Sequence, residues 1–136
     1  MKQLKKRSDC PISSALDFLG DKWSLLIIRD MIFEGKKTYN EFLASEEKIA
    51  TNILANRLQS LTTAGIISRR EHPDNKSKIL YEVTPKGAEL LPLLLEYILW
   101  SDTHYEIAPK AREFARIIRK DKSGVLKHWQ NKLAGI

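Results

Sequence analysis

Amide and hydroxyl side chains recur at helical spacing within residues 49–70, IATNILANRLQSLTTAGIISRR. At about 100° per residue, three leucines fall in one narrow sector of the predicted helix, and the neutral polar residues fall on its far side. The leucines are Leu54, Leu58 and Leu61, and the far side carries Asn52, Asn56, Gln59 and Thr63, with Ala55 at its edge. A solvated face usually favours Lys, Glu and Arg, which form helices better than Asn and pair at i,i+4. The neutral face therefore indicates a ligand other than water.

The chemistry of this face suits the major groove of double-stranded DNA. There, Asn and Gln can each donate to and accept from an adenine edge, and Thr can hydrogen-bond a base or offer a methyl group to thymine. The alternative is that these are tolerated polar residues on a helix that Thr51 caps. We favour the DNA interpretation because the flanking elements suit it. The predicted base contacts are Thr51, Asn52, Ala55, Asn56 and Gln59.

Start and stop residues place this helix second in a helix-turn-helix. It is predicted from about Ala50 to Ala64, before the stop residue Gly65. A short helix precedes it, TYNEFLA, which opens at Thr38 with the S/T-x-x-E spacing of a capping box. Two earlier helices are expected, one over residues 11–20 that ends on a left-handed glycine, and one that Asp21 caps.

Two β-rich runs follow the helix-turn-helix. IISRREH and SKILYEVT flank the turn-forming PDNK, which predicts a β-hairpin wing. Its cations could contact phosphates, or could equally belong to a solvated hairpin whose tip is charged. Arg57, at the edge of the helix's packing face, could likewise reach DNA or pair with an acid inside the domain. The phosphate candidates are Thr38, Arg57, Arg69, Arg70, Lys76 and Lys78.

A long apolar helix is expected to begin with Thr84 as its N-cap and to run to about His104, with a kink near Pro92. Apolar residues surround most of it, so it must be covered on more than one side. Two amphipathic helices close the chain and could provide that cover, but we favour a second subunit, which suits twofold-symmetric DNA sites. The predicted dimer contacts are Leu91, Leu94, Leu95, Ile98 and Leu99.

The elements together predict a mainly α fold with a small β-hairpin wing (α+β). This is a winged helix-turn-helix with flanking N- and C-terminal dimerisation helices. We expect one domain over residues 1–136. Its DNA-binding core spans about 22–84, and its dimerisation helices span about 11–20 and 85–134.

Several runs in one order resemble a known family. CPISSALDFLGDKWSLLIIRDM, TYNEFL, IATNILANRLQSLTTAGII and LYEVTPKGAELLPLL are similar to the HxlR-type bacterial transcriptional regulators, which are related to the MarR group. The resemblance covers about residues 10–105. It implies a homodimer that binds palindromic operator DNA and represses or activates transcription. The chain departs from the family pattern at Lys48, Ile49 and Ala50, where many relatives have Gly-Ile-Ser, and it lacks the usual Pro-Pro-Arg of the wing.

Cys10, the single cysteine, excludes an intrachain disulfide. It precedes Pro11 at a predicted helix start and follows Lys6 and Arg7, a setting that is typical of reactive thiols. The resemblance implies that a cysteine here can sense oxidants or electrophiles. The alternative is a small packed residue. We therefore name an oxidant or a small molecule as the expected effector.

Charge and composition exclude several classes of protein. The formal charge is +6, but the first eight residues carry four bases and no acid, and residues 107–136 carry eight bases against two acids. The span between them is net acidic, which leaves a protein-binding winged-helix module as the alternative function. No signal peptide or membrane span is evident, so we expect a cytoplasmic protein. The histidines lack metal-ligand spacing and no glycine-rich phosphate loop occurs, so no enzyme, metal or cofactor is predicted.

Overall fold

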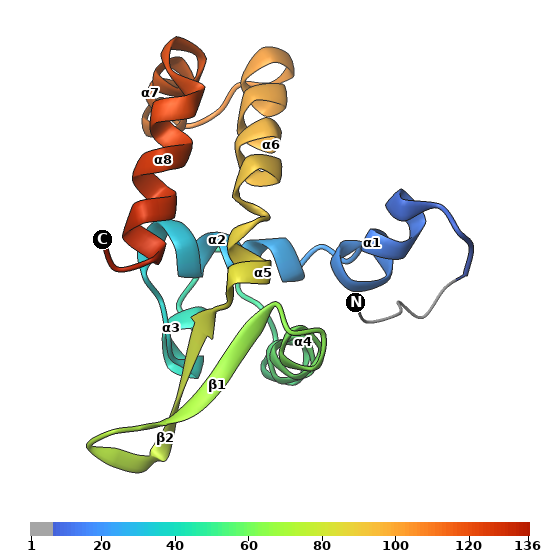
Figure 1. Cartoon of the computed structure of the whole chain (residues 1–136), viewed down its shortest axis with the longest axis vertical. Coiled ribbons are helices and arrows are strands. Elements are labelled where there is room, and N and C mark those ends of the chain that lie inside the picture. Colours follow the sequence, from blue (N-terminus) through green and yellow to red (C-terminus); the bar gives the residue numbers. More distant parts are fainter. Residues whose placement is uncertain (1–6) are drawn as a thin grey trace. The chain divides into compact units, whose positions relative to one another are not determined.

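The computed structural model describes residues 7–136 (Figure 1). The chain folds into two compact units, one ending at Thr84 and the other beginning at Pro85. The first unit contains α1 to α4 and a two-stranded sheet. The second contains α5 to α8. The mainly helical architecture with a single antiparallel hairpin confirms the predicted fold class among these residues.

The first two helices are α1 (Pro11–Leu19) and α2 (Ser24–Glu34). The expected left-handed stop at Gly20 is wrong, because this glycine has a φ of −80°. Glycine is required there for a different reason: a Cβ atom would lie 2.5 Å from the carbonyl oxygen of Leu16. Asp21 lies further from α2 than an N-cap does, yet its Oδ2 accepts hydrogen bonds from the backbone N–H groups of Trp23 at 3.0 Å and Ser24 at 2.9 Å. Asp21 therefore still satisfies the free amides at the start of α2.

The helix-turn-helix consists of α3 (Tyr39–Leu43) and α4 (Thr51–Thr63). The capping box at Thr38 is confirmed, since its Oγ1 accepts from the N–H of Glu41 and its own N–H donates to the Glu41 carboxylate. The cap at Thr51 that the alternative interpretation assumed is absent. The capping position is Ala50, whose side chain offers no acceptor, and Thr51 is already helical.

The hairpin pairs β1 (Ile67–His72) with β2 (Asn75–Val83), with only Pro73 and Asp74 between the strands. The turn is shorter than the four residues expected, and a bulge interrupts the register between Glu71 and His72. The backbone N–H of Tyr81 also donates to the carbonyl of Lys37 at 2.8 Å, which joins β2 to the segment before α3.

The second unit contains α5 (Pro85–Ala88), α6 (Leu91–His104), α7 (Pro109–Lys120) and α8 (Lys122–Leu133). The single long helix with a kink near Pro92 that the sequence predicts is instead two helices, because α5 ends at Ala88 and α6 begins at Leu91. Pro92 lacks an N–H and its ring opposes the carbonyl four residues earlier, so the first helix stops and the second begins just before it. Within this unit α6 packs against α7, and α7 against α8, with Ala115 and Ile118 fully buried. Within residues 7–136, no helix is long and apolar enough to cross a membrane.

Candidate nucleic-acid interface

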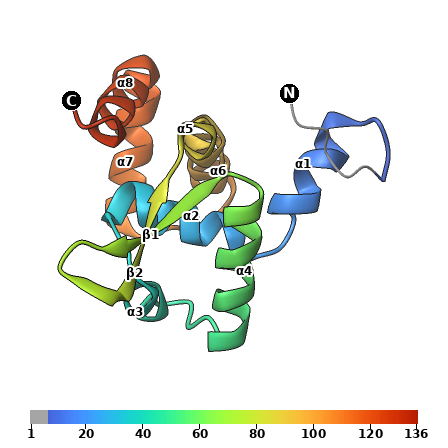
Figure 2. The same ribbon diagram turned by 60° about the horizontal axis from the view of Figure 1, so that its bottom comes forward.

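The outer face of α4 is exposed as the sequence predicts. All five residues predicted to contact bases are exposed: Thr51, Asn52, Ala55, Asn56 and Gln59. On the opposite side Leu54, Leu58 and Leu61 are at most 2% exposed and form the core beneath the helix. The apolar face packs α4 against the rest of the first unit, and Figure 2 shows α4 beside the strand β1 of the hairpin.

Polar contacts also fix the start of α4. The Tyr39 hydroxyl, at the beginning of α3, donates to the backbone carbonyl of Thr51 at 3.0 Å. Tyr39 was not among the predicted residues. Its position in a short helix gives no periodic signal, so sequence spacing could not have found this contact.

Arg57 lies between the exposed face and the core. Its guanidinium donates to Asn56 Oδ1, at 2.6 Å from Nη2, and approaches Asp21 Oδ1 at 3.4 Å. Burial alone would raise the pKa of Asp21, but hydrogen bonds from Ser24 and Trp23 and the charge of Arg57 outweigh it and hold this pKa below its ordinary value. The acid inside the domain that the sequence analysis considered as a partner for Arg57 is thus present, and it is Asp21. Because the amide oxygen of Asn56 is occupied, its NH2 group is the part available to an adenine acceptor.

A groove of about 220 Å³ separates α4 from β1. Ala55 and Gln59 line it on the helix side, and Arg69 and Tyr81, which are opposite each other in the hairpin register, line it on the strand side. Among residues 7–136, the Arg69 guanidinium has no hydrogen bond or ion pair. The structure therefore brings Arg69, a predicted phosphate contact, beside two predicted base contacts.

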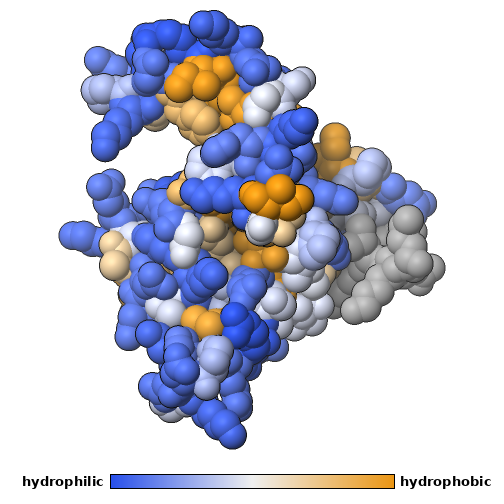
Figure 3. All heavy atoms as spheres, turned by 60° about the vertical axis from the view of Figure 1, so that its left-hand side comes forward, coloured by the Kyte–Doolittle hydropathy of each residue, from blue (hydrophilic) through white to orange (hydrophobic). Residues whose placement is uncertain are grey.

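The other cations of the wing lie apart from this groove. Arg70 points to the other face of β1 and forms an ion pair with Glu82 at 2.7 Å. Lys76 and Lys78 are exposed in β2. The hydrogen bond from the Lys37 N–H lowers the pKa of Glu41, and the charge of Lys78 acts in the same direction. Lys78 thus lies near the capping box of α3, where Thr38 is half-buried. On the face of the molecule shown in Figure 3, hydrophilic residues predominate around small hydrophobic patches.

Cys10 is exposed at the start of α1, which contradicts the interpretation of a small packed residue. Its expected neighbour Arg7 forms an ion pair with Asp17 at 2.7 Å, while Lys6 lies outside the described residues. Across residues 7–136, no cluster of His, Cys, Asp and Glu could hold a metal ion.

The predicted dimer contacts are largely buried within the single chain. Leu91, Leu94 and Leu95 are at most 6% exposed, and Ile98 and Leu99 are half-buried. The exposed large apolar residues of α6 are instead Leu93, Tyr97 and Trp100. The burial of Leu91, Leu94 and Leu95 argues against their predicted role as dimer contacts, because buried side chains cannot meet a second subunit without rearrangement.

A family model described as HxlR-like helix-turn-helix matches residues 18–109. An uncharacterised HTH-type transcriptional regulator of Synechocystis sp. is 35% identical over 86 residues, which cover 63% of each chain. The chain thus spans less than two thirds of that relative. The HTH-type transcriptional regulator YodB of Bacillus subtilis is 33% identical over 98 residues, or 71% of this chain and 87% of YodB.

Solved structures of regulators are also similar. The reduced form of YodB has a TM-score of 0.59 at 32% identity and covers 73% of this chain and 97% of its own. The redox regulator HypR in its oxidised form has a TM-score of 0.64 at 30% identity and covers 72% of this chain and all of its own.

Proposed function

The chain belongs to the HxlR-like helix-turn-helix family, and on that premise we propose that it is a cytoplasmic transcriptional regulator that binds a palindromic operator as a homodimer. The observation that carries the proposal is the exposed neutral face of α4 beside Arg69, whose guanidinium has no partner within residues 7–136. A recognition helix needs side chains that can read base edges and a neighbouring cation that can contact the phosphate backbone. The role is regulatory and needs no catalytic group.

We assign base readout to the exposed face of α4 and phosphate contact to the residues around it. Asn52 and Asn56 offer amides, Thr51 a hydroxyl and methyl, and Ala55 and Gln59 extend the face along the groove. Arg69 is the strongest phosphate candidate because its guanidinium is uncommitted within residues 7–136. Arg57 and Arg70 must first give up their intramolecular partners, whereas Lys76 and Lys78 are exposed. These assignments support the expected DNA-binding core over residues 22–84.

The homodimer would use apolar side chains that the single chain leaves uncovered. On α1, Ile12 is 71% and Leu16 is 49% exposed, and α6 exposes Leu93, Tyr97 and Trp100. Monomeric proteins seldom expose such residues at helical spacing, and twofold-symmetric assembly is the commonest way to cover them. A dimer also supplies the two recognition helices that a palindromic site requires.

An effector that acts on Cys10 would couple DNA binding to redox state. The exposed thiol at the start of α1 supports this proposal, as does the similarity to HypR, a redox regulator. A single cysteine can form a disulfide only with a second chain or with a small thiol.

Selection of genomic fragments with the purified protein at near-physiological salt tests the proposed function. The affinity of the enriched site and of scrambled DNA is then measured across a salt series. We expect an inverted repeat with half-sites about one helical turn or a multiple apart, and affinity that falls steeply with salt. Absence of enrichment in both reducing and oxidising buffer would overturn the DNA proposal. It would favour the protein-binding module, whose apolar interface would depend little on salt.

A further inference from the structure

Asp30, in α2, is a buried carboxylate that anchors a polar network. Asp30 is 2% exposed, and burying a carboxylate costs folding free energy unless the charge is paired. Oδ1 accepts from Arg29 Nε at 2.9 Å and Nη2 at 2.7 Å, and Oδ2 accepts from the Ser45 hydroxyl and from Lys36 Nζ at 3.5 Å. Burial alone would raise its pKa, but the hydrogen bonds from Ser45 and Arg29 outweigh it and hold the pKa of Asp30 below its usual value. Asp30 is therefore a charged, buried anchor on α2 that holds Arg29 and, in the turn between α3 and α4, Ser45.

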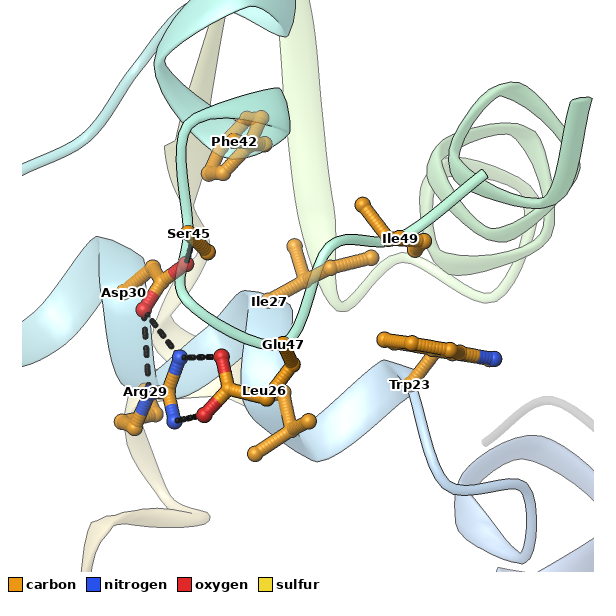
Figure 4. Close-up of a pocket in the computed structure, with 9 residues that line it drawn as sticks. All are labelled: Trp23, Leu26, Ile27, Arg29, Asp30, Phe42, Ser45, Glu47 and Ile49. Carbon is orange, nitrogen blue, oxygen red and sulfur yellow. Dashed lines mark hydrogen bonds and ion pairs between the residues drawn. The ribbon is translucent and has the colours of Figure 1, made fainter. Parts of the chain in front are cut away.

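Arg29 extends this anchor to Glu47 (Figure 4). Its Nη1 and Nη2 donate to the two carboxylate oxygens of Glu47 at 2.8 and 2.9 Å, the fork geometry that a guanidinium makes with a carboxylate. Because Asp30 also holds Ser45, both ends of the tripeptide from Ser45 to Glu47 are tied to the same point on α2. This tripeptide is the turn that leads into α4.

The backbone after this tripeptide needs such a restraint. Lys48 has a φ of 57°, a left-handed conformation that costs energy for a side chain other than glycine. Ala50 provides no side-chain cap for α4. Ile49 is buried between these two residues. The path into α4 is therefore held by the polar network, by Ile49 and by the Tyr39 hydroxyl bonded to the carbonyl of Thr51, and not by a capping side chain.

We infer that Arg29 and Glu47 are positioning residues for DNA recognition: their forked ion pair, anchored on Asp30, sets the path of the chain into α4 and so aligns Thr51 and Asn52 with the bases. This inference rests on the proposed function. Exposed ion pairs contribute little to stability, and the Arg29 and Glu47 side chains are 32% and 38% exposed. A carboxylate before the recognition helix would also repel phosphates if it were free. Glu47 thus serves the alignment of α4 more than the stability of the fold.

Alanine substitutions at Glu47 and at its neighbour Glu46 separate positioning from charge. Glu46 is exposed, and its side chain has no hydrogen bond or ion pair with residues 7–136. Each substitution removes one negative charge close to DNA, so electrostatics alone predicts equal or tighter binding for both. We expect Glu47→Ala to weaken operator affinity about tenfold, the equivalent of one good base contact, while Glu46→Ala binds as tightly as the wild type or better. Equal effects of the two variants would overturn the inference.

The substitution Arg29→Lys tests whether the bidentate geometry of the Arg29–Glu47 ion pair is needed. Lysine keeps the charge, but a single ammonium group cannot hold Asp30 and Glu47 in the same bidentate arrangement. Operator affinity should fall as it does for Glu47→Ala, with affinity for scrambled DNA nearly unchanged, both corrected for the folded fraction. Wild-type operator affinity in Arg29→Lys would show that charge alone is sufficient.

Hydrogen exchange in the DNA-free full-length protein gives a second readout. The amides of Ile49 to Ile53 should exchange faster in Glu47→Ala than in Glu46→Ala, because the path into α4 is no longer held. This measurement does not need DNA, so it tests the role of the Arg29–Glu47 ion pair even if no operator is found. Unchanged exchange in Glu47→Ala would overturn the inference, whereas failure of the wild type to select an operator would count against the proposed function.

Discussion

The helices α4 and α7 have nearly the same length, 13 and 12 residues, and both bury one apolar side, but their outer faces differ. α7 exposes arginines with partners: Arg112 and Arg119 pair with Asp102 on α6, and Arg116 pairs with Glu113 on its own helix. The exposed face of α4 carries neutral amides and hydroxyls. A charged outer face that is satisfied within its own unit needs no ligand. Within residues 7–136 the side chains on the neutral face of α4 make only short-range hydrogen bonds, from Arg57 to Asn56 and from Gln59 to Thr63, and no ion pair with another helix. This difference supports a role in recognition.

The buried sides of the two helices should respond alike, and their loss is the largest effect we expect. Leu58→Ala in α4 and Ile118→Ala in α7 each remove a side chain that is at most 2% exposed. Each should cost about 2–5 kcal/mol of stability, because the transfer term and the cavity term add. Urea denaturation followed by circular dichroism measures the loss. A change below about 1 kcal/mol for either variant would show that burial does not hold that helix.

The outer faces should respond differently. Asn56→Ala should cost about 1–3 kcal/mol of binding free energy on the operator and little on random DNA. Arg116→Ala on α7 is the matched control and should leave operator affinity unchanged, because its partner is Glu113. Fluorescence anisotropy on both DNAs distinguishes the two. Equal losses for Asn56→Ala on operator and random DNA would break the distinction between the helices, since base readout would then be absent.

Arg69 adds a second test of the difference between α4 and α7, because it is the cation beside the neutral outer face of α4. Arg69→Gln should weaken operator and random DNA alike, by about 1 kcal/mol, and reduce the slope of log affinity against log salt by about 1. Arg70→Gln should have less effect, since that guanidinium is already paired with Glu82. A salt slope that stays constant in Arg69→Gln would exclude a phosphate contact at this position.

The smallest effect concerns the carboxylate that precedes α4. The hydrogen bonds from Arg29 lower the pKa of Glu47 to about 2, despite some burial that opposes this. Because the folded-state pKa lies below the unfolded value of about 4.3, the ion pair stabilises the protein fully above that value and is lost as pH falls toward about 2. Solvent screens the pair, so its contribution at neutral pH should be about 0.2–1 kcal/mol.

The thermal midpoint of the wild type and of Glu47→Gln, measured from pH 7 down to pH 2, tests this dependence. The difference between the two proteins should be largest at neutral pH and should vanish at the acidic end. A difference that persists at pH 2 would mean that a source other than the ionised carboxylate stabilises the turn.

Periodic burial was predictable from sequence and long-range pairing was not. Leu54, Leu58 and Leu61 recur at helical spacing, and their burial follows directly from it. The capping box at Thr38 was predictable for the same reason, since both partners lie within one turn. Arg29 and Glu47 are 18 residues apart and share no pattern, so only the folded chain brings them together.

Local rules also failed where tertiary contacts decide. Gly20 has the sequence signature of a left-handed stop but is selected by a close approach to a backbone carbonyl. In α6, the hydrophobic pattern indicates only that several sides of the helix are covered. It does not reveal that Leu91 and Leu95 are buried in the single chain while Tyr97 is exposed.

The bulge between Glu71 and His72 separates the hairpin into two segments with different tolerance to change over evolution. On its inner side, the alternation of strand side chains keeps Arg69 on the groove face, and a shift of one residue there would turn it away. Beyond the bulge, insertions at Pro73 and Asp74 would lengthen the loop without shifting that register. Descendants of this protein can therefore acquire wings of different reach while the cation beside the recognition helix stays in place.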